Sequence, residues 1–132
     1  MNQDSILEFR IRYSETDQMG GFYNSRVLEW FEMGRTELFR KKGLPYTEIE
    51  ARGVFLPIVE AHVQYERRAF YDDLLRISAD SRMHGKARIQ CNHVIFHADS
   101  GETVAQGYTI HACVDSGGKV IRPPRWLVDL VE

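Results

Sequence analysis

The chain has 132 residues, 43% of them hydrophobic, and its 17 basic and 19 acidic residues give a formal net charge of −2 at pH 7. This length corresponds to one domain with enough apolar residues for one core, so we expect a single domain over residues 1–132. The lack of a basic excess argues against a protein that binds nucleic acid mainly through phosphates.

The sequence also limits where the chain can reside. No run of residues approaches the roughly 18 to 20 consecutive apolar residues that cross a bilayer. Residues 1–5 lack the basic region and the apolar core of a signal peptide. We therefore expect a soluble cytoplasmic protein without a membrane span. Its cysteines, Cys91 and Cys113, lie in apolar, strand-like segments without a Cys-x-x-Cys pair, which favours buried reduced thiols over a disulfide or a zinc site.

A strand is the first element that the pattern predicts. Apolar and charged residues alternate from Leu7 to Tyr13, with the period of two that is typical of a half-buried strand. Small and polar residues follow over 14–21, and the adjacent Gly20 and Gly21 favour a turn with unusual backbone angles.

Two helices are expected next. Apolar residues recur at intervals of three and four as far as Gly43, which predicts one long amphipathic helix with Asn24 or Ser25 as its N-terminal cap. A short second helix then has Pro45 near its first turn, a capping box at Thr47-x-x-Glu50 and a stop at Gly53.

The rest of the chain is predicted to form strands joined by short polar turns, which favours an antiparallel meander. The expected strands cover residues 54–67, 74–83, 86–97 and 103–114. Alternation at Val59, Ala61, Val63 and Tyr65 indicates that one face of the sheet is buried. Pro57 argues for an edge, a bulge or a bend near the start of its strand, and a short terminal helix is expected around residues 127–131.

These elements predict an α+β domain. A five-stranded, curved antiparallel sheet would bury the stripe of Trp30, Phe31 and Leu38 on the long helix, because no other surface is available to cover it.

A carboxylate stands at a chemically favourable place in this arrangement. Asp17 lies in the glycine-rich turn just before a helix whose first N–H groups have no partner inside the helix. Such N–H groups stabilise an anion, so they could hold a developing oxyanion while Asp17 acts as general base or nucleophile. The alternative is that Asp17 only bonds amides of the turn, as aspartate commonly does in loops.

The segments 13–24 and 27–35 closely resemble the signature of the 4-hydroxybenzoyl-CoA thioesterase-like hot-dog family, particularly its YbgC-like acyl-CoA thioesterase branch. In that signature a Thr-Asp pair is followed by a glycine, a Tyr/Asn/His-containing turn and a helix with an aromatic-aromatic-Glu-x-small-Arg motif. The resemblance continues through residues 54–60, 65–75 and 107–123, so it spans nearly the whole chain. It implies the hot-dog fold, in which the sheet wraps around the long helix.

The resemblance also implies roles for residues. Asp17 matches the catalytic carboxylate, and the backbone N–H of Asn24 matches the donor that polarises the thioester carbonyl. Gly20 and Gly21 match the turn that lets the carbonyl approach the backbone. The Asn24 side chain replaces the histidine that is frequent in this branch, and Arg68 stands where the family commonly has proline.

In the resembled family the site lies between two subunits, which implies a homodimer or a dimer of dimers, that is, a homotetramer. The acyl group runs along the helix there, and Tyr23 is a candidate to line its apolar tunnel, together with Met19, Phe22, Trp30 and Phe31. These residues are just as often plain core.

Three further residues are candidates for contact with the substrate. Lys86 and Arg88 roughly match a basic segment that contacts CoA phosphates, whereas the residues alone favour solvated charges. Glu60 could help to position water or a partner's loop, whereas the simpler interpretation is a solvated or salt-bridged glutamate. Glu32 and Arg35 are expected to form a structural ion pair.

Together these features predict hydrolysis of an acyl-CoA thioester to a free acid and CoA. The histidine spacing does not indicate a metal site, no cofactor is expected, and the sequence has no Gly-x-Ser-x-Gly elbow. Two alternatives stay open, a hot-dog dehydratase and a non-catalytic module that binds acyl thioesters. The acyl group, and the choice between CoA and a carrier protein as thiol carrier, also stay open.

Overall fold

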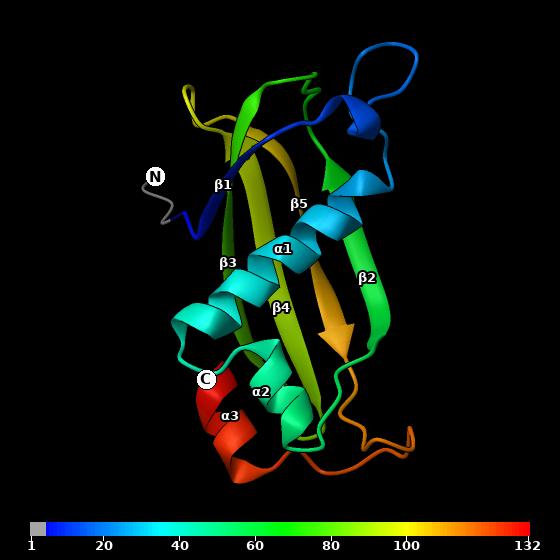
Figure 1. Ribbon diagram of the computed structural model, residues 1–132, viewed down its shortest axis with the longest axis vertical. Helices are drawn as coiled ribbons and strands as arrows, with labels where there is room; N and C mark the ends of the chain where they lie inside the picture. Colours follow the sequence, from blue (N-terminus) through cyan, green and yellow to red (C-terminus); the bar gives the residue numbers. More distant parts are fainter. Residues whose placement is uncertain (1–4) are drawn as a thin grey trace.

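In the computed structural model, which describes residues 5–132, five strands form one antiparallel sheet and a long helix, α1, crosses one of its faces (Figure 1). The strands are β1 (Leu7–Arg10), β2 (Ile58–Tyr65), β3 (Leu74–His84), β4 (Arg88–His97) and β5 (Thr103–His111). The helices are α1 (Arg26–Lys41), α2 (Tyr46–Ala51) and α3 (Arg125–Val131), and a 3-10 turn, η1, covers Tyr13–Glu15. None of the helices in this described part is both long enough and apolar enough to cross a membrane. The predicted α+β architecture is confirmed.

The strand order is β1-β3-β4-β5-β2, so the expected meander holds only for β3, β4 and β5. β2 pairs with β5 instead of β3, because the connection of residues 66–73 passes over the end of the sheet before β3 begins. This connection pairs with the turn that precedes α1: the Phe22 N–H donates to the Ala69 carbonyl at 3.1 Å. Two distant loops are thereby brought side by side at one end of the molecule.

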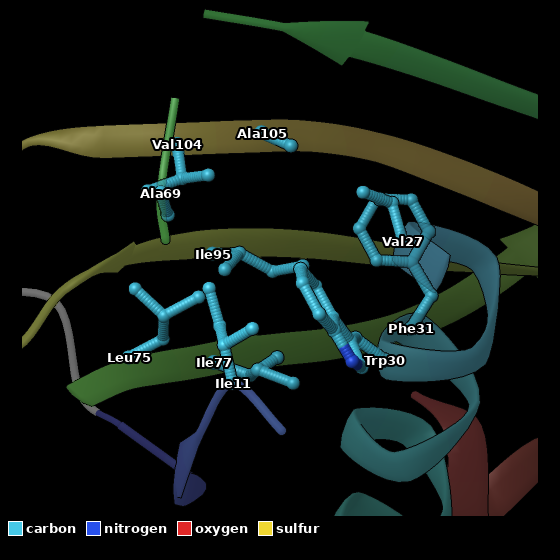
Figure 2. Close-up of a cluster of buried hydrophobic side chains, with 10 residues drawn as sticks. All are labelled: Ile11, Val27, Trp30, Phe31, Ala69, Leu75, Ile77, Ile95, Val104 and Ala105. Atoms are coloured by element: carbon cyan, nitrogen blue, oxygen red, sulfur yellow. The ribbon is translucent and has the colours of Figure 1, made fainter. Parts of the chain in front are cut away.

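The long helix buries the expected stripe against the sheet. Trp30 and Phe31 are fully buried, and Figure 2 shows them among aliphatic side chains of the strands. Gly34 allows the close approach, because a Cβ at this position would lie 2.8 Å from Cγ2 of Ile77. A second apolar cluster includes Ile49 of α2, residues of α3, and both Cys91 and Cys113, which are buried and free as expected.

Most of the β2 face that was expected to be buried is exposed, which corrects the sequence prediction; Val63 is partly buried and packs against the core. α1 lies mainly over β3 and β4. At the sheet edge, Ile58 and Val59 keep 44% and 48% of their surface accessible, and Tyr65 keeps 46%. The expectation for Pro57 is confirmed, since β2 is an edge strand with a register shift between Ile58 and Glu60.

Two local predictions are wrong. The Thr47-x-x-Glu50 capping box does not form, because α2 begins at Tyr46 and has Pro45 as its N-cap, which places Thr47 inside the helix. Glu32 and Arg35 form no ion pair among the described residues.

The environment of Arg35 explains the missing pair. Glu32 is exposed, whereas Arg35 is turned inward and is buried beside the Tyr46 hydroxyl. Burial raises the pKa of Tyr46 to about 12, although the charge of Arg35 opposes this shift.

Candidate active site

The turn that carries Asp17 is anchored by a buried carboxylate. The predicted first strand ends early, at Arg10, because the chain turns into η1 and places Glu15 in the interior with 4% of its surface accessible. One oxygen of Glu15 accepts from the Arg12 backbone N–H at 2.7 Å, and the other accepts from the Trp30 indole N–H at 2.9 Å. Sequence reasoning did not single out Glu15, although it lies two residues before Asp17.

Residues 16–22, the Asp17 loop, form a tight hairpin. The Asp17 N–H donates to the Gly21 carbonyl at 2.8 Å, and the Gly20 N–H donates to the Asp17 carbonyl at 3.1 Å. Gly20 has φ of 83°, a left-handed conformation that glycine adopts without steric cost. Gly20 therefore shapes the loop as the sequence indicated, whereas Gly21 does not have a positive φ.

Asp17 is exposed, and only one of its two carboxylate oxygens accepts a hydrogen bond from the described part of the chain. Its Oδ1 accepts from the Met19 N–H at 2.8 Å, which is the turn-stabilising role of the simpler interpretation. Within residues 5–132, its Oδ2 accepts no hydrogen bond. One oxygen is therefore available to a bound molecule.

A cavity of about 410 Å³ adjoins Asp17, and two segments of the chain line it. They are held together by the Phe22–Ala69 hydrogen bond described above. One segment contributes Asp17, Met19, Phe22 and Asn24, and the other contributes Tyr65, Glu66, Arg67, Arg68 and Ala69. The structure therefore places Asp17 and Asn24 on the same cavity.

Asn24 lies at the start of α1, and among the described residues its backbone carbonyl is hydrogen-bonded whereas its backbone N–H is not. Its carbonyl accepts from the Val27 N–H at 3.3 Å and from the Tyr65 hydroxyl at 2.8 Å. Its own N–H has no acceptor within the described chain. Ser25 occupies the N-cap position without a side-chain capping bond. A free N–H at the positive end of a helix is suited to a developing oxyanion.

Tyr65 joins the exposed edge strand to this helix start. Its hydroxyl spans from β2 to Asn24 and donates to the Asn24 carbonyl, and burial raises the pKa of Tyr65. The sequence placed Tyr65 in a motif without giving it a role, and only the strand order brings it to the cavity.

Of the expected apolar lining, Met19 and Phe22 lie on the cavity, whereas Trp30 and Phe31 belong to the core. Tyr23 is 57% exposed and its backbone N–H donates to the Glu15 carbonyl at 2.8 Å; its side chain is not among those lining the cavity.

The other candidate residues lie elsewhere in the chain. Glu60 accepts from the Tyr108 hydroxyl at 2.9 Å, on the face of the sheet away from α1. Lys86 and Arg88 lie at the β3–β4 turn, at the opposite end of the molecule from the Asp17 loop (Figure 1). Lys86 borders a separate hollow with Arg122 and Arg125. One chain alone does not bring these residues to Asp17.

Sequence reasoning missed the charged wall of the cavity. Glu66 is engaged by the Gln106 side chain, and Arg67 pairs with Glu102 at 3.1 Å. Arg68 takes part in no ion pair among residues 5–132. The signal for this wall was a run of three charged residues directly after Tyr65, at the end of a predicted strand.

Residues 11–131 match the family model of the thioesterase-like superfamily. The chain belongs to this superfamily. A relative from Bacillus subtilis, "Putative acyl-CoA thioesterase YneP", is 31% identical over 111 residues, which cover 84% of this chain and 80% of the relative. The resemblance predicted from the signature is thereby confirmed.

Solved structures similar to this chain show the same fold. A hypothetical protein from Aquifex aeolicus matches with a TM-score of 0.87 and 25% identity, covering 96% of this chain and 98% of that chain. A DHNA-CoA thioesterase from Staphylococcus aureus matches with a TM-score of 0.84 and 29% identity, covering 93% and 83%. The sheet and its long helix are the hot-dog fold that the sequence predicted.

Proposed function

We propose that this protein hydrolyses acyl-CoA thioesters to a free acid and CoA, with Asp17 as its catalytic carboxylate. The observation that carries the proposal is the cavity lined by both Asp17 and Asn24; the Asp17 Oδ2 and the Asn24 N–H have no hydrogen-bond partner within residues 5–132. The thioesterase names of the relatives from Bacillus subtilis and Staphylococcus aureus support the reaction class.

In the general-base route, Asp17 takes a proton from water while the water oxygen attacks the thioester carbon. The carbonyl oxygen becomes an oxyanion, and the Asn24 N–H with the helix N-terminus stabilises it. When the tetrahedral intermediate collapses, the C–S bond breaks and the protonated Asp17 returns the proton to the leaving thiolate.

In the nucleophilic route, the Asp17 carboxylate attacks the carbonyl carbon and forms a mixed anhydride as the thiolate leaves. Water then cleaves the anhydride and restores the carboxylate. The same oxyanion donor serves both routes.

Release of free thiol from a panel of acyl-CoAs, by wild-type protein and Asp17→Asn, tests the proposal. Loss of a general base lowers the rate by about 10² to 10⁴-fold. Asp115→Asn is a matched control, because the Asp115 Oδ1 also accepts from the N–H two residues ahead, that of Gly117 at 2.9 Å, in a turn away from this cavity. Near-wild-type turnover in Asp17→Asn would refute the role of Asp17.

The bond from Met19 N–H to Asp17 favours one second candidate, a non-catalytic module that binds acyl thioesters. Such a module would bind CoA esters and release no thiol from any of them.

A dehydratase is less well supported, because its family pattern centres on a histidine and none of the nine residues that line the cavity is a histidine. Formation of an enoyl product from a 3-hydroxyacyl thioester, without release of thiol, would reveal this activity.

We also propose that a second copy pairs with β2 and completes the site. The support is the exposed apolar surface of this edge strand at Ile58 and Val59, together with the family signature. Antiparallel pairing of two identical strands would place the far end of one copy beside the Asp17 end of the other, which is how Glu60, Lys86 and Arg88 could approach substrate. Sedimentation velocity, which distinguishes a monomer from a dimer or a dimer of dimers, measures the assembly.

A further inference from the structure

We infer that Arg68 binds an anionic or acidic oxygen on the acyl group, so that the site prefers acyl groups carrying a carboxylate or a hydroxyl close to the thioester. This inference rests on the proposed function and names the substrate class that the site prefers. Position 68 departs from the proline that is common at this place in the resembled family.

The first argument is that Arg68 has no ion-pair partner in the described part of the chain. Three charged side chains come from the segment after Tyr65, and two of them are already engaged. Glu66 is bonded to Gln106, while Arg67 pairs with Glu102 and donates to the Thr103 carbonyl at 3.1 Å. Arg68 has no carboxylate partner among residues 5–132, so its charge is free to meet an anion in the cavity that it lines.

The second argument is that the guanidinium of Arg68 is seated on the Asp17 loop. Its Cζ lies 5.3 Å from the centre of the Phe70 ring, a cation–π distance. The guanidinium also lies against Gly21, where an added Cβ would be 2.5 Å from Nη2 and 3.2 Å from Nε. Gly21 does not have a positive φ. This glycine therefore makes space for Arg68 and is not required by the turn.

The third argument concerns which part of the substrate the guanidinium can reach. Gly21 accepts the hydrogen bond of the Asp17 N–H, so Arg68 packs on the residue that closes the hairpin around the catalytic carboxylate. The phosphates of CoA are separated from the thioester by the whole pantetheine arm. An acidic group on the acyl side, next to the reacting carbonyl, is the anion that lies within reach. Asn24 already supplies a donor for the carbonyl oxygen itself.

The test compares matched substrates that differ in one acidic group: succinyl-CoA against butanoyl-CoA, and 2-hydroxybenzoyl-CoA against benzoyl-CoA. A hydrogen bond to a charged group corresponds to about a 10- to 100-fold change in kcat/KM. In at least one pair we expect Arg68→Gln to lower kcat/KM by this factor for the acidic member and to leave the neutral member within about threefold. Arg82→Gln on β3 removes a guanidinium that likewise has no ion-pair partner among residues 5–132 and does not line this cavity, so it should leave the preference unchanged.

Gly21→Ala provides a second, independent variant. The new methyl group would displace the guanidinium, so we expect the same loss of preference as in Arg68→Gln and no further loss when both changes are combined. Thermal midpoints of all variants show whether the fold persists. Arg68→Lys retains the charge without the planar fork and should recover part of the preference.

Equal losses for both members of both pairs would overturn the inference. If those losses vanish with N-acetylcysteamine thioesters, which have no phosphate, then Arg68 binds the carrier phosphates instead. If they persist, Arg68 serves every substrate alike. Failure of the proposed function is a distinct result, because wild-type protein would then release no thiol from any ester in the panel.

Discussion

The indole N–H of Trp30 donates to the buried carboxylate of Glu15 at 2.9 Å, and this contact fixes the Asp17 loop to the main helix. The same carboxylate accepts the Arg12 N–H on its other oxygen. The loop and the first turns of α1 therefore share one buried polar anchor, and the position of the proposed catalytic carboxylate depends on it.

Glu15→Gln should destabilise the protein. A glutamine can accept on one oxygen, so its NH₂ group would meet one of the two donors, and one buried donor would stay unpaired. Leaving a buried donor unsatisfied costs about 1 to 3 kcal/mol. Urea denaturation measures the change, with exposed Glu29→Gln as the control. In the double variant with Trp30→Phe, the loss of unfolding free energy should be smaller than the sum of the losses in the two single variants. Strictly additive losses would show that the hydrogen bond between Trp30 and Glu15 does not contribute to stability.

Tyr65→Phe should lower kcat by about fivefold with little change in KM, since it removes one hydrogen bond worth about 1 kcal/mol to the carbonyl of Asn24. The positions of the neighbouring N–H groups would then be less well fixed when the oxyanion forms. Steady-state kinetics measure this, and Tyr71→Phe, an exposed tyrosine, is the control. A change in KM alone would instead indicate that Tyr65 binds substrate.

The two variants Asn24→Ala and Asn24→Pro distinguish the contribution of the Asn24 side chain to activity from that of its backbone N–H. Alanine retains the N–H, so most activity should persist. Proline deletes it, and loss of one oxyanion donor lowers kcat by about 10² to 10³-fold. Circular dichroism checks that α1 survives, because proline is tolerated near helix starts. A fully active proline variant would place the oxyanion donor elsewhere.

The stability of the fold should fall as the pH decreases from about 6.5 towards 4. Burial, assisted by the charge of Arg35, lowers the pKa of His93 to about 3, and burial lowers the pKa of His111 to about 4. Below the unfolded-state pKa of about 6.5, the unfolded chain binds protons that the folded chain rejects, so each histidine contributes up to about 1.4 kcal/mol of loss per pH unit.

Thermal midpoints recorded from pH 4 to 8 check this dependence. Neither ring nitrogen of His93 has a hydrogen-bond partner within the described chain, so His93→Leu should be tolerated at pH 7 and should flatten the decline at lower pH. An unchanged slope in this variant would show that His93 does not contribute.

The parts of the fold that follow from local patterns could be predicted, and those that depend on strand order could not. The period of α1 identified Trp30 and Phe31 as core, because a helix of this kind has one apolar face to bury. The alternation in β2 is equally regular, yet Val59 and Tyr65 are exposed because their strand lies at the sheet edge, whereas α1 lies mainly over β3 and β4.

The candidate site likewise contains residues that a local pattern identifies and residues that only the strand order brings together. Asp17 and Asn24 were found because they belong to one continuous signature. Arg68 was noted only as a departure from the family pattern and was given no role, because it reaches the cavity through a connection that crosses the end of the sheet. Glu15 was missed because a glutamate in a short polar segment gives no sign of burial.

The contact between Gly21 and Arg68 constrains how this cavity can diverge. The two positions are 47 residues apart in the chain, yet a side chain at the first would occupy the space of the guanidinium at the second. A larger residue at position 21 would push the end of the flexible arginine side chain off the Asp17 loop without removing its charge from the chain. Among descendants of this sequence, a change at position 21 should therefore alter the choice of substrate even where the arginine is retained.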